Sequence, residues 1–189
     1  MRKVVVSNLV SLDGYFAGPN GELDWHIVND EFFQYAIDLL DSVDTLLFGR
    51  VTYQGMVSYW TSANAIENDA IIAAKMNNTP KVVFSKTLDK VEWGKWNNAR
   101  LVKDNIGDEI SKLKQQPGKN MVIYGSGTLV SALTELGLID DYQIIVVPVV
   151  LGNGKPLFKD IAKPVNLKLT GTQRFKTGVV KLSYEPART

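Results

Sequence analysis

Residues 121–133 restrict the possible folds of this chain most strongly, because the hydrophobic pattern changes its period within them. The segment begins with the apolar run MVIY, which is typical of a buried strand and ends at Gly125. Beyond Gly127, apolar residues recur at Leu129, Val130 and Leu133, which is the spacing of an amphipathic helix. The segment therefore predicts a strand, a glycine turn and a helix in succession.

The turn between this strand and this helix suits a phosphate group. Glycine lets a ligand approach the backbone closely, and the first N–H groups of a helix lack intrahelical partners and have a partial positive charge. The candidate ligand is a nucleotide, and the candidate binding residues are Gly125, Ser126, Gly127 and Thr128. The alternative is a tight turn without a ligand, because the sequence matches neither the full G-x-G-x-x-G pattern nor a P-loop.

Two further predicted strands end in residues that suit an anion. The apolar segment 45–48 is followed by glycine, arginine and threonine residues, and segment 81–84 is followed by serine and lysine. In an open α/β sheet, ligands bind outside the carboxyl ends of the strands, so the three strand ends are expected to converge. We therefore predict a nucleotide site at this edge of the sheet. Its additional candidate residues are Gly49, Arg50, Thr52, Ser85 and Lys86.

The composition is that of one ordinary globular domain spanning residues 1–189. Hydrophobic residues make up 45% of the chain, and 21 basic side chains against 20 acidic ones give a formal net charge of +1. This balance argues against a disordered or nucleic-acid-binding protein. The absence of cysteine excludes disulfides, thiolate metal sites and cysteine nucleophiles. Because His26 is the sole histidine, we expect neither a Ser-His-Asp triad nor a metal site built from several histidines.

The sequence also predicts a cytoplasmic protein without a membrane partner. Its first residues contain only a short apolar run before polar residues follow. No uninterrupted apolar run in the chain approaches the roughly 20 residues that a membrane helix needs.

A helix is predicted from its N-cap Asn29 to about Val43, after a segment, residues 11–25, that lacks helical period. A loop of this length in a compact domain is usually functional, so segment 11–25 is a candidate lid. The predicted apolar stripe of this helix consists of Phe32, Phe33, Ala36, Ile37, Leu40 and Val43. On a helical wheel, Asp30 lies beside Ile37 at the edge of this stripe, and Glu31 lies further toward solvent. The Asp30 carboxylate is therefore predicted to face a cavity. Its alternative role is that of a surface acid that stabilises the helix dipole.

The order of the predicted elements indicates a three-layer α/β fold. Strands alternate with helices until segment 165–184, which has the pattern of two strands. This order predicts a mostly parallel central sheet with helices on both faces and an antiparallel C-terminal hairpin. The apolar strand 142–150 is long for one small monomer to cover, so we predict a homodimer that pairs through this edge. Alternatively, the hairpin covers it within one chain.

Four motifs together resemble one known fold family. They are SLDGYFA at residues 11–17, LLFGRVTY at 46–53, YGSGTL at 124–129 and PVVLGNGKPLF at 148–158. In this order they resemble the dihydrofolate reductase fold, and more closely the reductase domain of the bifunctional deaminase-reductase of riboflavin biosynthesis and its stand-alone bacterial relatives. The resemblance covers nearly the whole chain and implies NADPH as the hydride donor. It also implies that Gly49, Arg50 and Thr52 hold the adenosine phosphates, that Ser85 and Lys86 lie near the 2′-phosphate, and that residues 125–128 bind the pyrophosphate.

The resemblance also implies a substrate site. Dihydrofolate reductases have an acid in a W-x-x-x-x-D pattern on the first helix, and Trp25 and Asp30 match that pattern here. Asp30 is therefore the predicted catalytic acid, which orients the substrate ring and assists its protonation, and Asp13 and Trp25 are predicted to share the substrate site. The chain departs from true dihydrofolate reductases at Tyr124, where they have glycine, and it has no clear counterpart of the arginine that binds the folate glutamate.

We therefore predict a reductase that uses NADPH to reduce a pyrimidine or pteridine-like ring. The substrate that the resemblance implies is the ribosylaminopyrimidine of riboflavin synthesis. Two alternatives stay open. One is a reductase of dihydrofolate or another pterin, and the other is a nucleotide-binding protein that retains the fold and has lost the chemistry.

Overall fold

An eight-stranded sheet lies at the centre of the computed structural model, which describes residues 1–187. Its strands have the spatial order β5-β4-β3-β6-β1-β7-β10-β9, so the first strand of the chain lies in the interior of the sheet. β2 and β8 form a second, two-stranded sheet. The strands are β1 Val4–Ser11, β2 Tyr15–Ala17, β3 Val43–Gly49, β4 Lys81–Phe84, β5 Ala99–Val102, β6 Asn120–Tyr124, β7 Asp141–Val147, β8 Lys155–Pro156, β9 Leu167–Arg174 and β10 Val180–Pro186.

The large sheet is parallel except at one end. The six strands from β5 to β7 in the spatial order are parallel to one another. β10 pairs antiparallel with both β7 and β9, so β9 and β10 form the predicted C-terminal hairpin. Because the βα connections place helices on the faces of a parallel sheet, this topology explains why the inner strands are buried on both sides.

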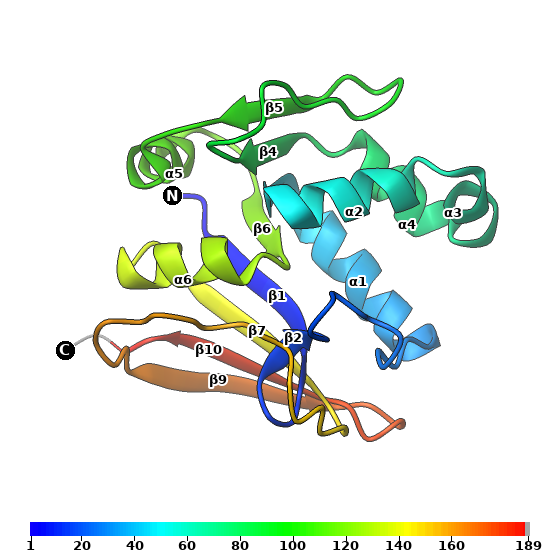
Figure 1. Cartoon of the computed structure of the whole chain (residues 1–189), viewed down its shortest axis with the longest axis vertical. Coiled ribbons are helices and arrows are strands. Elements are labelled where there is room, and N and C mark those ends of the chain that lie inside the picture. The colour runs from blue at the N-terminus through cyan, green and yellow to red at the C-terminus, as the bar shows by residue number, and fades with distance from the viewer. Residues whose placement is uncertain (188–189) are drawn as a thin grey trace.

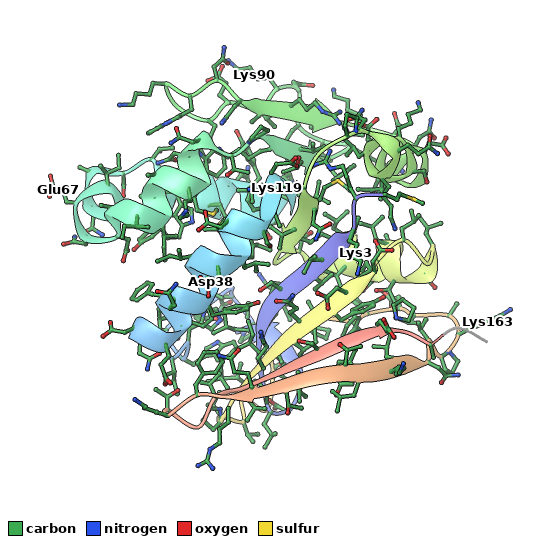
Figure 2. All side chains as sticks on the ribbon, turned by 180° about the vertical axis from the view of Figure 1, so that it is seen from behind. Lys3, Asp38, Glu67, Lys90, Lys119 and Lys163 are labelled. Atoms are coloured by element: carbon green, nitrogen blue, oxygen red, sulfur yellow. The ribbon has the colours of Figure 1, made fainter. Side chains whose placement is uncertain are left out.

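Helices cover both faces of the sheet and complete the predicted three layers (Figure 1). α6 crosses the near face in Figure 1, and the reverse view in Figure 2 shows α1 across the opposite face. One buried apolar cluster contains residues of α1, α2 and α4, and the other contains residues of α5 and α6. The helices are α1 Asp30–Ser42, α2 Arg50–Trp60, α3 Ala63–Asn68, α4 Ala70–Asn78, α5 Ile106–Gln115 and α6 Gly127–Glu135. Within residues 1–187, no helix is both long and apolar enough to cross a membrane.

The helix predicted after Asn29 is α1. The Asn29 side chain accepts a hydrogen bond from the Phe32 N–H at 3.1 Å, which confirms the predicted N-cap. Asp30 and Glu31 lie in the first turn, where acidic groups complement the helix dipole. The helix ends at Ser42, and β3 begins at the next residue.

Segment 11–25 was predicted as a loop, and the structure places a short strand within it. This strand, β2, pairs antiparallel with β8. After β2 the chain makes a tight turn in which the Gly18 N–H donates to the Glu22 carbonyl at 2.9 Å. Three residues are too few to reveal a strand period in a sequence, which is why the pattern did not show β2. The function of the segment as a lid stays a prediction.

Segment 142–150 was predicted to form a free edge, and this prediction was wrong. β7, which makes up most of the segment, lies between β1 and β10, and the strand at this end of the sheet is β9. The hairpin therefore covers β7 within one chain, which is the alternative considered above. The homodimer itself stays a prediction, but it cannot form by pairing of β7 with a second copy.

Candidate functional site

The three strand ends that the sequence indicated lie side by side. β4, β3 and β6 are adjacent and parallel, so their carboxyl ends lie at one edge of the sheet. Gly49 is the last residue of β3, Ser85 follows β4 and Gly125 follows β6. The fold thus brings the predicted cofactor residues together at the position where ligands bind in open α/β sheets.

Glycines at two of these strand ends let neighbouring turns pack closely. A Cβ atom on Gly49 would lie 2.0 Å from the Oγ of Ser126 and 2.9 Å from its Cβ. A Cβ atom on Gly125 would lie 2.8 Å from the Oγ1 of Thr52 and 2.9 Å from its Cγ2. Protein interiors do not hold contacts this short, so the site requires glycine at both positions.

Two helix N-termini meet at this edge, and neither is capped by a side chain. Gly49 is the N-cap of α2 and Ser126 is the N-cap of α6, and no side-chain hydrogen bond caps either helix. The first N–H groups of both helices therefore favour an anionic ligand. Ser126 has left-handed backbone angles, with φ 58° and ψ 73°, and follows the left-handed Gly125. A left-handed non-glycine residue costs about 1–2 kcal/mol, and such strain is concentrated at functional sites.

The buried side chain of Asn8 fixes the backbone of the turn between β6 and α6. When its amide is oriented to satisfy both neighbours, its oxygen accepts from the Gly125 N–H at 3.0 Å and its nitrogen donates to the Ser7 carbonyl at 3.2 Å. The small β2–β8 sheet supports the same turn, because a Cβ on Gly127 would lie 2.7 Å from the Pro156 carbonyl oxygen. Sequence reasoning missed Asn8. The available signal was a polar pair in the middle of a β-branched strand.

The charged and hydroxyl candidates after β3 and β4 differ in their surroundings. Arg50 and Lys86 are exposed, so both side chains are free to move toward a ligand. The Oγ of Ser85 accepts hydrogen bonds from the N–H groups of Thr87 and Leu88, each at 3.2 Å. Ser85 therefore organises its own turn, which presents Lys86, and its hydroxyl also lies 3.3 Å from that of Thr87.

Asp30 and Glu31 occupy positions different from those predicted. The buried residues of α1 are Tyr35, Leu39 and Leu40, so the buried face is rotated toward Tyr35 relative to the predicted stripe. Residues four positions apart share a helix face, which brings Glu31 into line with Tyr35. Glu31 is half-buried, and its Oε2 accepts a hydrogen bond from the Lys176 N–H at 2.8 Å. The prediction that Glu31 points toward solvent was therefore wrong. Asp30 is exposed, so the prediction that its carboxylate faces a cavity was also wrong. Its role as the catalytic acid stays a prediction.

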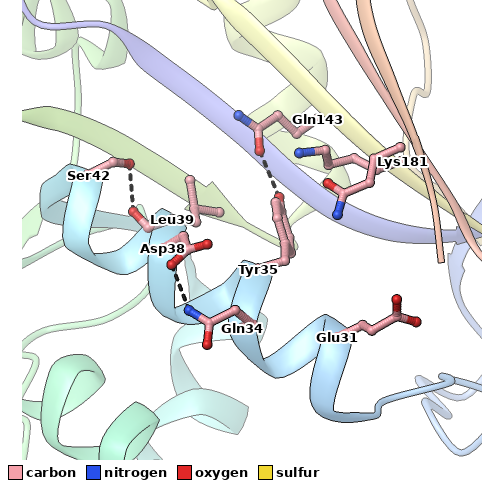
Figure 3. Close-up of a pocket in the computed structure, with 9 residues that line it drawn as sticks. Glu31, Gln34, Tyr35, Asp38, Leu39, Ser42, Gln143 and Lys181 are labelled. Atoms are coloured by element: carbon pink, nitrogen blue, oxygen red, sulfur yellow. Dashed lines mark hydrogen bonds between the residues drawn. The ribbon is translucent and has the colours of Figure 1, made fainter.

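A polar pocket of about 280 Å³ lies between α1 and strands β7, β9 and β10 (Figure 3). Glu31, Tyr35, Gln143 and Lys181 are among its lining residues, whereas neither Asp30 nor any predicted cofactor residue lines it. The Tyr35 hydroxyl donates to the Oε1 of Gln143 at 2.8 Å and lies 2.7 Å from the hydroxyl of Ser7. Burial lowers the pKa of the Lys181 ammonium, which lies 4.7 Å from the centre of the Tyr35 ring.

Asp13 holds the glycine-rich loop that follows β7. Its carboxylate accepts hydrogen bonds from the N–H groups of Leu151 at 3.1 Å and Gly152 at 2.8 Å. A hydrogen bond with the Ser11 hydroxyl, together with these two backbone bonds, holds the pKa of Asp13 below its ordinary value. Its predicted contact with substrate stays a prediction, but its two oxygens already have protein partners.

Trp25, the other predicted substrate residue, lies on the face of the sheet that α1 covers. Its half-buried ring packs against the apolar cluster on the α1 face of the sheet. Its Nε1 donates to the Glu22 carbonyl at 3.1 Å, and its ring meets the His26 ring edge-on with centroids 4.4 Å apart. Burial lowers the pKa of His26, so the imidazole favours its neutral form. These contacts fix the orientation of the indole ring.

The Tyr124–Gly125 peptide bond is trans, as are all the others in the described part of the chain. The turn obtains its shape from two consecutive left-handed residues, Gly125 and Ser126. Among residues 1–187, no group of three or more acidic or histidine side chains is placed to hold a metal ion. The arrangement thus offers backbone N–H groups and cationic side chains for an anionic cofactor.

Comparison with known proteins places these features in a family. The profile of the RibD C-terminal domain matches residues 2–181. The uncharacterised protein YyaP of Bacillus subtilis is 35% identical over 183 residues, which are 97% of this chain and 94% of that protein. A crystal structure of a protein assigned to riboflavin biosynthesis in Shewanella has a TM-score of 0.77 and 26% identity, and each chain covers 100% of the other.

Two more distant structures share the fold. A diaminohydroxyphosphoribosylaminopyrimidine deaminase/5-amino-6-(5-phosphoribosylamino)uracil reductase of Thermotoga maritima has a TM-score of 0.71 and 14% identity, over 98% of this chain and 57% of its own. Dihydrofolate reductase of Enterococcus faecalis, complexed with NADP(H), has a TM-score of 0.66 and 16% identity, over 98% of this chain and 97% of its own. These similarities confirm the predicted dihydrofolate reductase-like fold.

Proposed function

Because this chain belongs to the RibD C-terminal domain family, we propose that it is a reductase that uses NADPH to reduce a pyrimidine or pteridine-like ring. The first candidate substrate is 5-amino-6-(5-phosphoribosylamino)uracil, for which the reductase activity of the Thermotoga maritima protein is named. This chain spans 57% of that protein, so the proposal concerns the reductase activity alone. The observation that supports it most is the pair of uncapped helix N-termini at adjacent strand ends.

The residues at these strand ends fit a dinucleotide phosphate. Gly49 and Gly125 keep the turns free of side chains, and the first N–H groups of α2 and α6 would hold phosphate oxygens. The Arg50 guanidinium would add a charge-assisted hydrogen bond, and Lys86 would lie near a 2′-phosphate. When bound, NADPH supplies the hydride for the reaction.

The first turn of α1 fits the substrate side of the site. Asp30 is exposed there, so both of its carboxylate oxygens are available to accept hydrogen bonds from an amidine-like ring edge. Trp25 is fixed by its Glu22 hydrogen bond and offers an aromatic wall. We propose that Asp30 orients the ring and assists its protonation while Trp25 restricts its position.

A direct test measures NADPH oxidation by the purified chain with each candidate ring. Turnover with 5-amino-6-(5-phosphoribosylamino)uracil, well above that with dihydrofolate, is the expected result. Faster turnover with dihydrofolate would favour the second candidate function, which the spacing of Trp25 and Asp30 supports. Tight NADPH binding without turnover on either ring would contradict the reductase proposal and favour a nucleotide-binding protein that has lost the chemistry.

A further inference from the structure

A row of polar side chains crosses the α1 face of the sheet. Tyr124 of β6, Ser7 of β1, Gln143 of β7 and Ser183 of β10 are partners in register, and residues in register point to the same face. Tyr35 of α1 lies over this row and forms hydrogen bonds with Ser7 and Gln143. Most polar side chains in the middle of the row are therefore satisfied within the protein.

Tyr124 differs from its neighbours in this row, because its hydroxyl forms no hydrogen bond with any group of residues 1–187. The Tyr124 side chain is half-buried, and its hydroxyl oxygen is accessible from outside the protein. Burial, together with the nearby Tyr35, raises the pKa of Tyr124 far above neutrality, so its hydroxyl keeps its proton and can donate. An accessible donor at the end of a strand, without a hydrogen-bond partner in the protein, is available to a bound ligand.

The position of Tyr124 indicates which ligand that is. The next residue is Gly125, where the turn assigned to the cofactor begins. The Tyr124 ring packs against the same apolar cluster as Trp25 and Phe33, on the face where the first turn of α1 would hold the substrate. Tyr124 therefore lies beside the cofactor turn, on the face of the sheet that α1 covers.

We infer that Tyr124 is a specificity-determining residue that donates a hydrogen bond from its hydroxyl to a carbonyl oxygen or ring nitrogen of the substrate. The inference rests on the proposed reductase function and narrows its substrate class to heterocycles with an acceptor on the edge that faces β6. A ring that lacks such an acceptor would leave the phenol without a partner, and this lowers affinity by about tenfold to a hundredfold.

The test compares Tyr124→Phe with the unmodified chain, since this change removes one hydroxyl and keeps the ring that packs in the cluster. Calorimetric titration with 5-amino-6-(5-phosphoribosylamino)uracil gives the Kd of the ring, and fluorescence titration gives the Kd of NADPH. We expect the ring to bind about tenfold to a hundredfold more weakly to the variant, whereas the Kd of NADPH stays within about twofold.

Tyr142→Phe is the matched control. Tyr142 is buried in the cluster on the opposite face of the sheet, and its hydroxyl donates to the Oγ1 of Thr134 at 3.2 Å. This variant also loses one phenolic hydrogen bond, but far from the site, so both dissociation constants are expected to remain unchanged. Thermal unfolding of both variants checks that they are folded.

The outcomes separate this inference from the reductase proposal. If Tyr124→Phe binds the ring as tightly as the unmodified chain, the inference is wrong, and continued NADPH oxidation leaves the reductase proposal standing. A loss of NADPH affinity in Tyr124→Phe would also overturn the inference, because the hydroxyl would then contact the cofactor and not the substrate. If the unmodified chain neither binds nor reduces the ring or dihydrofolate, both proposals are wrong.

Discussion

Gly49 and Ser126 pack so closely that a Cβ atom on Gly49 would lie 2.9 Å from the Cβ of Ser126 and 2.0 Å from its hydroxyl oxygen. The Ser126 hydroxyl can rotate away from such a group, whereas its Cβ is fixed by the backbone. Since Gly49 ends β3 and Ser126 is the N-cap of α6, this contact sets the spacing between the two helix N-termini of the candidate site.

The first prediction is that Gly49→Ala destabilises the chain by about 1–3 kcal/mol, the usual cost of overpacking, and weakens NADPH binding. Urea unfolding and cofactor titration measure the two effects. Gly55→Ala is the control, because its Cβ meets nothing within 4 Å and lies within α2. This control is expected to stabilise the chain by about 0.5–1 kcal/mol.

A second-site change shows whether the contact itself is responsible. Ser126→Gly removes the obstructing Cβ, so the double variant Gly49→Ala, Ser126→Gly is expected to recover most of the stability lost in Gly49→Ala. If the two changes instead add independently, the close packing of these residues does not explain the cost of Gly49→Ala.

The cofactor preference is expected to depend on Arg50 and Lys86. Both are exposed cations beside the strand ends, and a charge-assisted hydrogen bond contributes about 1.5–3 kcal/mol. We predict that NADPH binds more tightly than NADH and that Arg50→Ala with Lys86→Ala removes most of this preference. Lys90→Ala is the control, since Lys90 pairs with Glu92 and is exposed. Equal affinities for the two cofactors in the unmodified chain would contradict the assignment.

Asp30→Asn is expected to lower turnover by roughly 10²–10⁴-fold and to leave NADPH affinity almost unchanged. The reason is that an amide cannot supply the negative charge or the proton of a carboxylic acid to the ring. Glu31→Gln is a demanding control, because Glu31 is half-buried and its oxygen accepts from the Lys176 N–H. A glutamine can still accept that bond, so its effect is expected to be small. If Glu31→Gln abolishes turnover and Asp30→Asn does not, the catalytic acid is Glu31.

Lys81 gives the stability of the chain an expected pH dependence. Its Nζ donates to the Asn77 carbonyl at 2.7 Å and the Asn98 Oδ1 at 3.1 Å, and lies 4.2 Å from the centre of the Trp93 ring. Burial without an acidic partner lowers the pKa of Lys81 to about 7, from 10.5. Between these values the unfolded chain binds a proton that the folded chain has released. The free energy of unfolding is therefore expected to rise with pH across this interval, by up to about 1.4 kcal/mol per pH unit.

Denaturant unfolding at a series of pH values from about 7 to 9.5 measures this slope. Lys81→Met removes the titrating group and keeps an unbranched side chain, so its slope is expected to be smaller than that of the unmodified chain. Lys163→Met, which removes an exposed lysine, should leave the slope unchanged. A slope that persists in Lys81→Met would assign the pH dependence to other groups.

The sequence predicted those parts of the fold that local patterns determine. Residues 121–133 form a strand, a turn and a helix because a change of hydrophobic period is a local property. The convergence of Gly49, Ser85 and Gly125 followed from one rule about parallel sheets. The dimer edge at 142–150 was predicted wrongly because strand order depends on contacts between distant segments, and β10 covers β7.

Errors at the site arose from amphipathic and polar residues. The ring of Tyr35 is buried, and its hydroxyl forms hydrogen bonds with Ser7 and Gln143. Because tyrosine has both an apolar ring and a polar group, the predicted apolar stripe did not include Tyr35, and the buried face of α1 was predicted wrongly. The buried side chain of Asn8 accepts a hydrogen bond from the Gly125 N–H, so its polar oxygen is satisfied inside the protein. Asn8 and Gly125 are far apart in the sequence. No periodicity reveals a side chain whose partner is the backbone of another strand.

Asp13 is expected to affect substrate binding through the loop after β7, because its carboxylate binds the N–H groups of Leu151 and Gly152. Asp13→Ala should speed amide hydrogen exchange at these two residues and raise KM more than it lowers kcat. Asp13→Asn keeps an acceptor oxygen and should have an intermediate effect. Asp24→Ala, which removes an exposed acid of the same segment, is the control.

The pH dependence of this protection has a definite sign. The pKa of Asp13 is lowered in the folded chain, so its hydrogen bonds stabilise the loop fully above the ordinary pKa of an aspartate. The protection of Leu151 and Gly152 should therefore be constant near neutral pH and should fall as the pH drops through the lowered value. In Asp13→Ala the exchange should lack this acid transition. If Asp13→Ala leaves the exchange unchanged and abolishes substrate binding, Asp13 contacts the substrate directly, as the sequence first predicted.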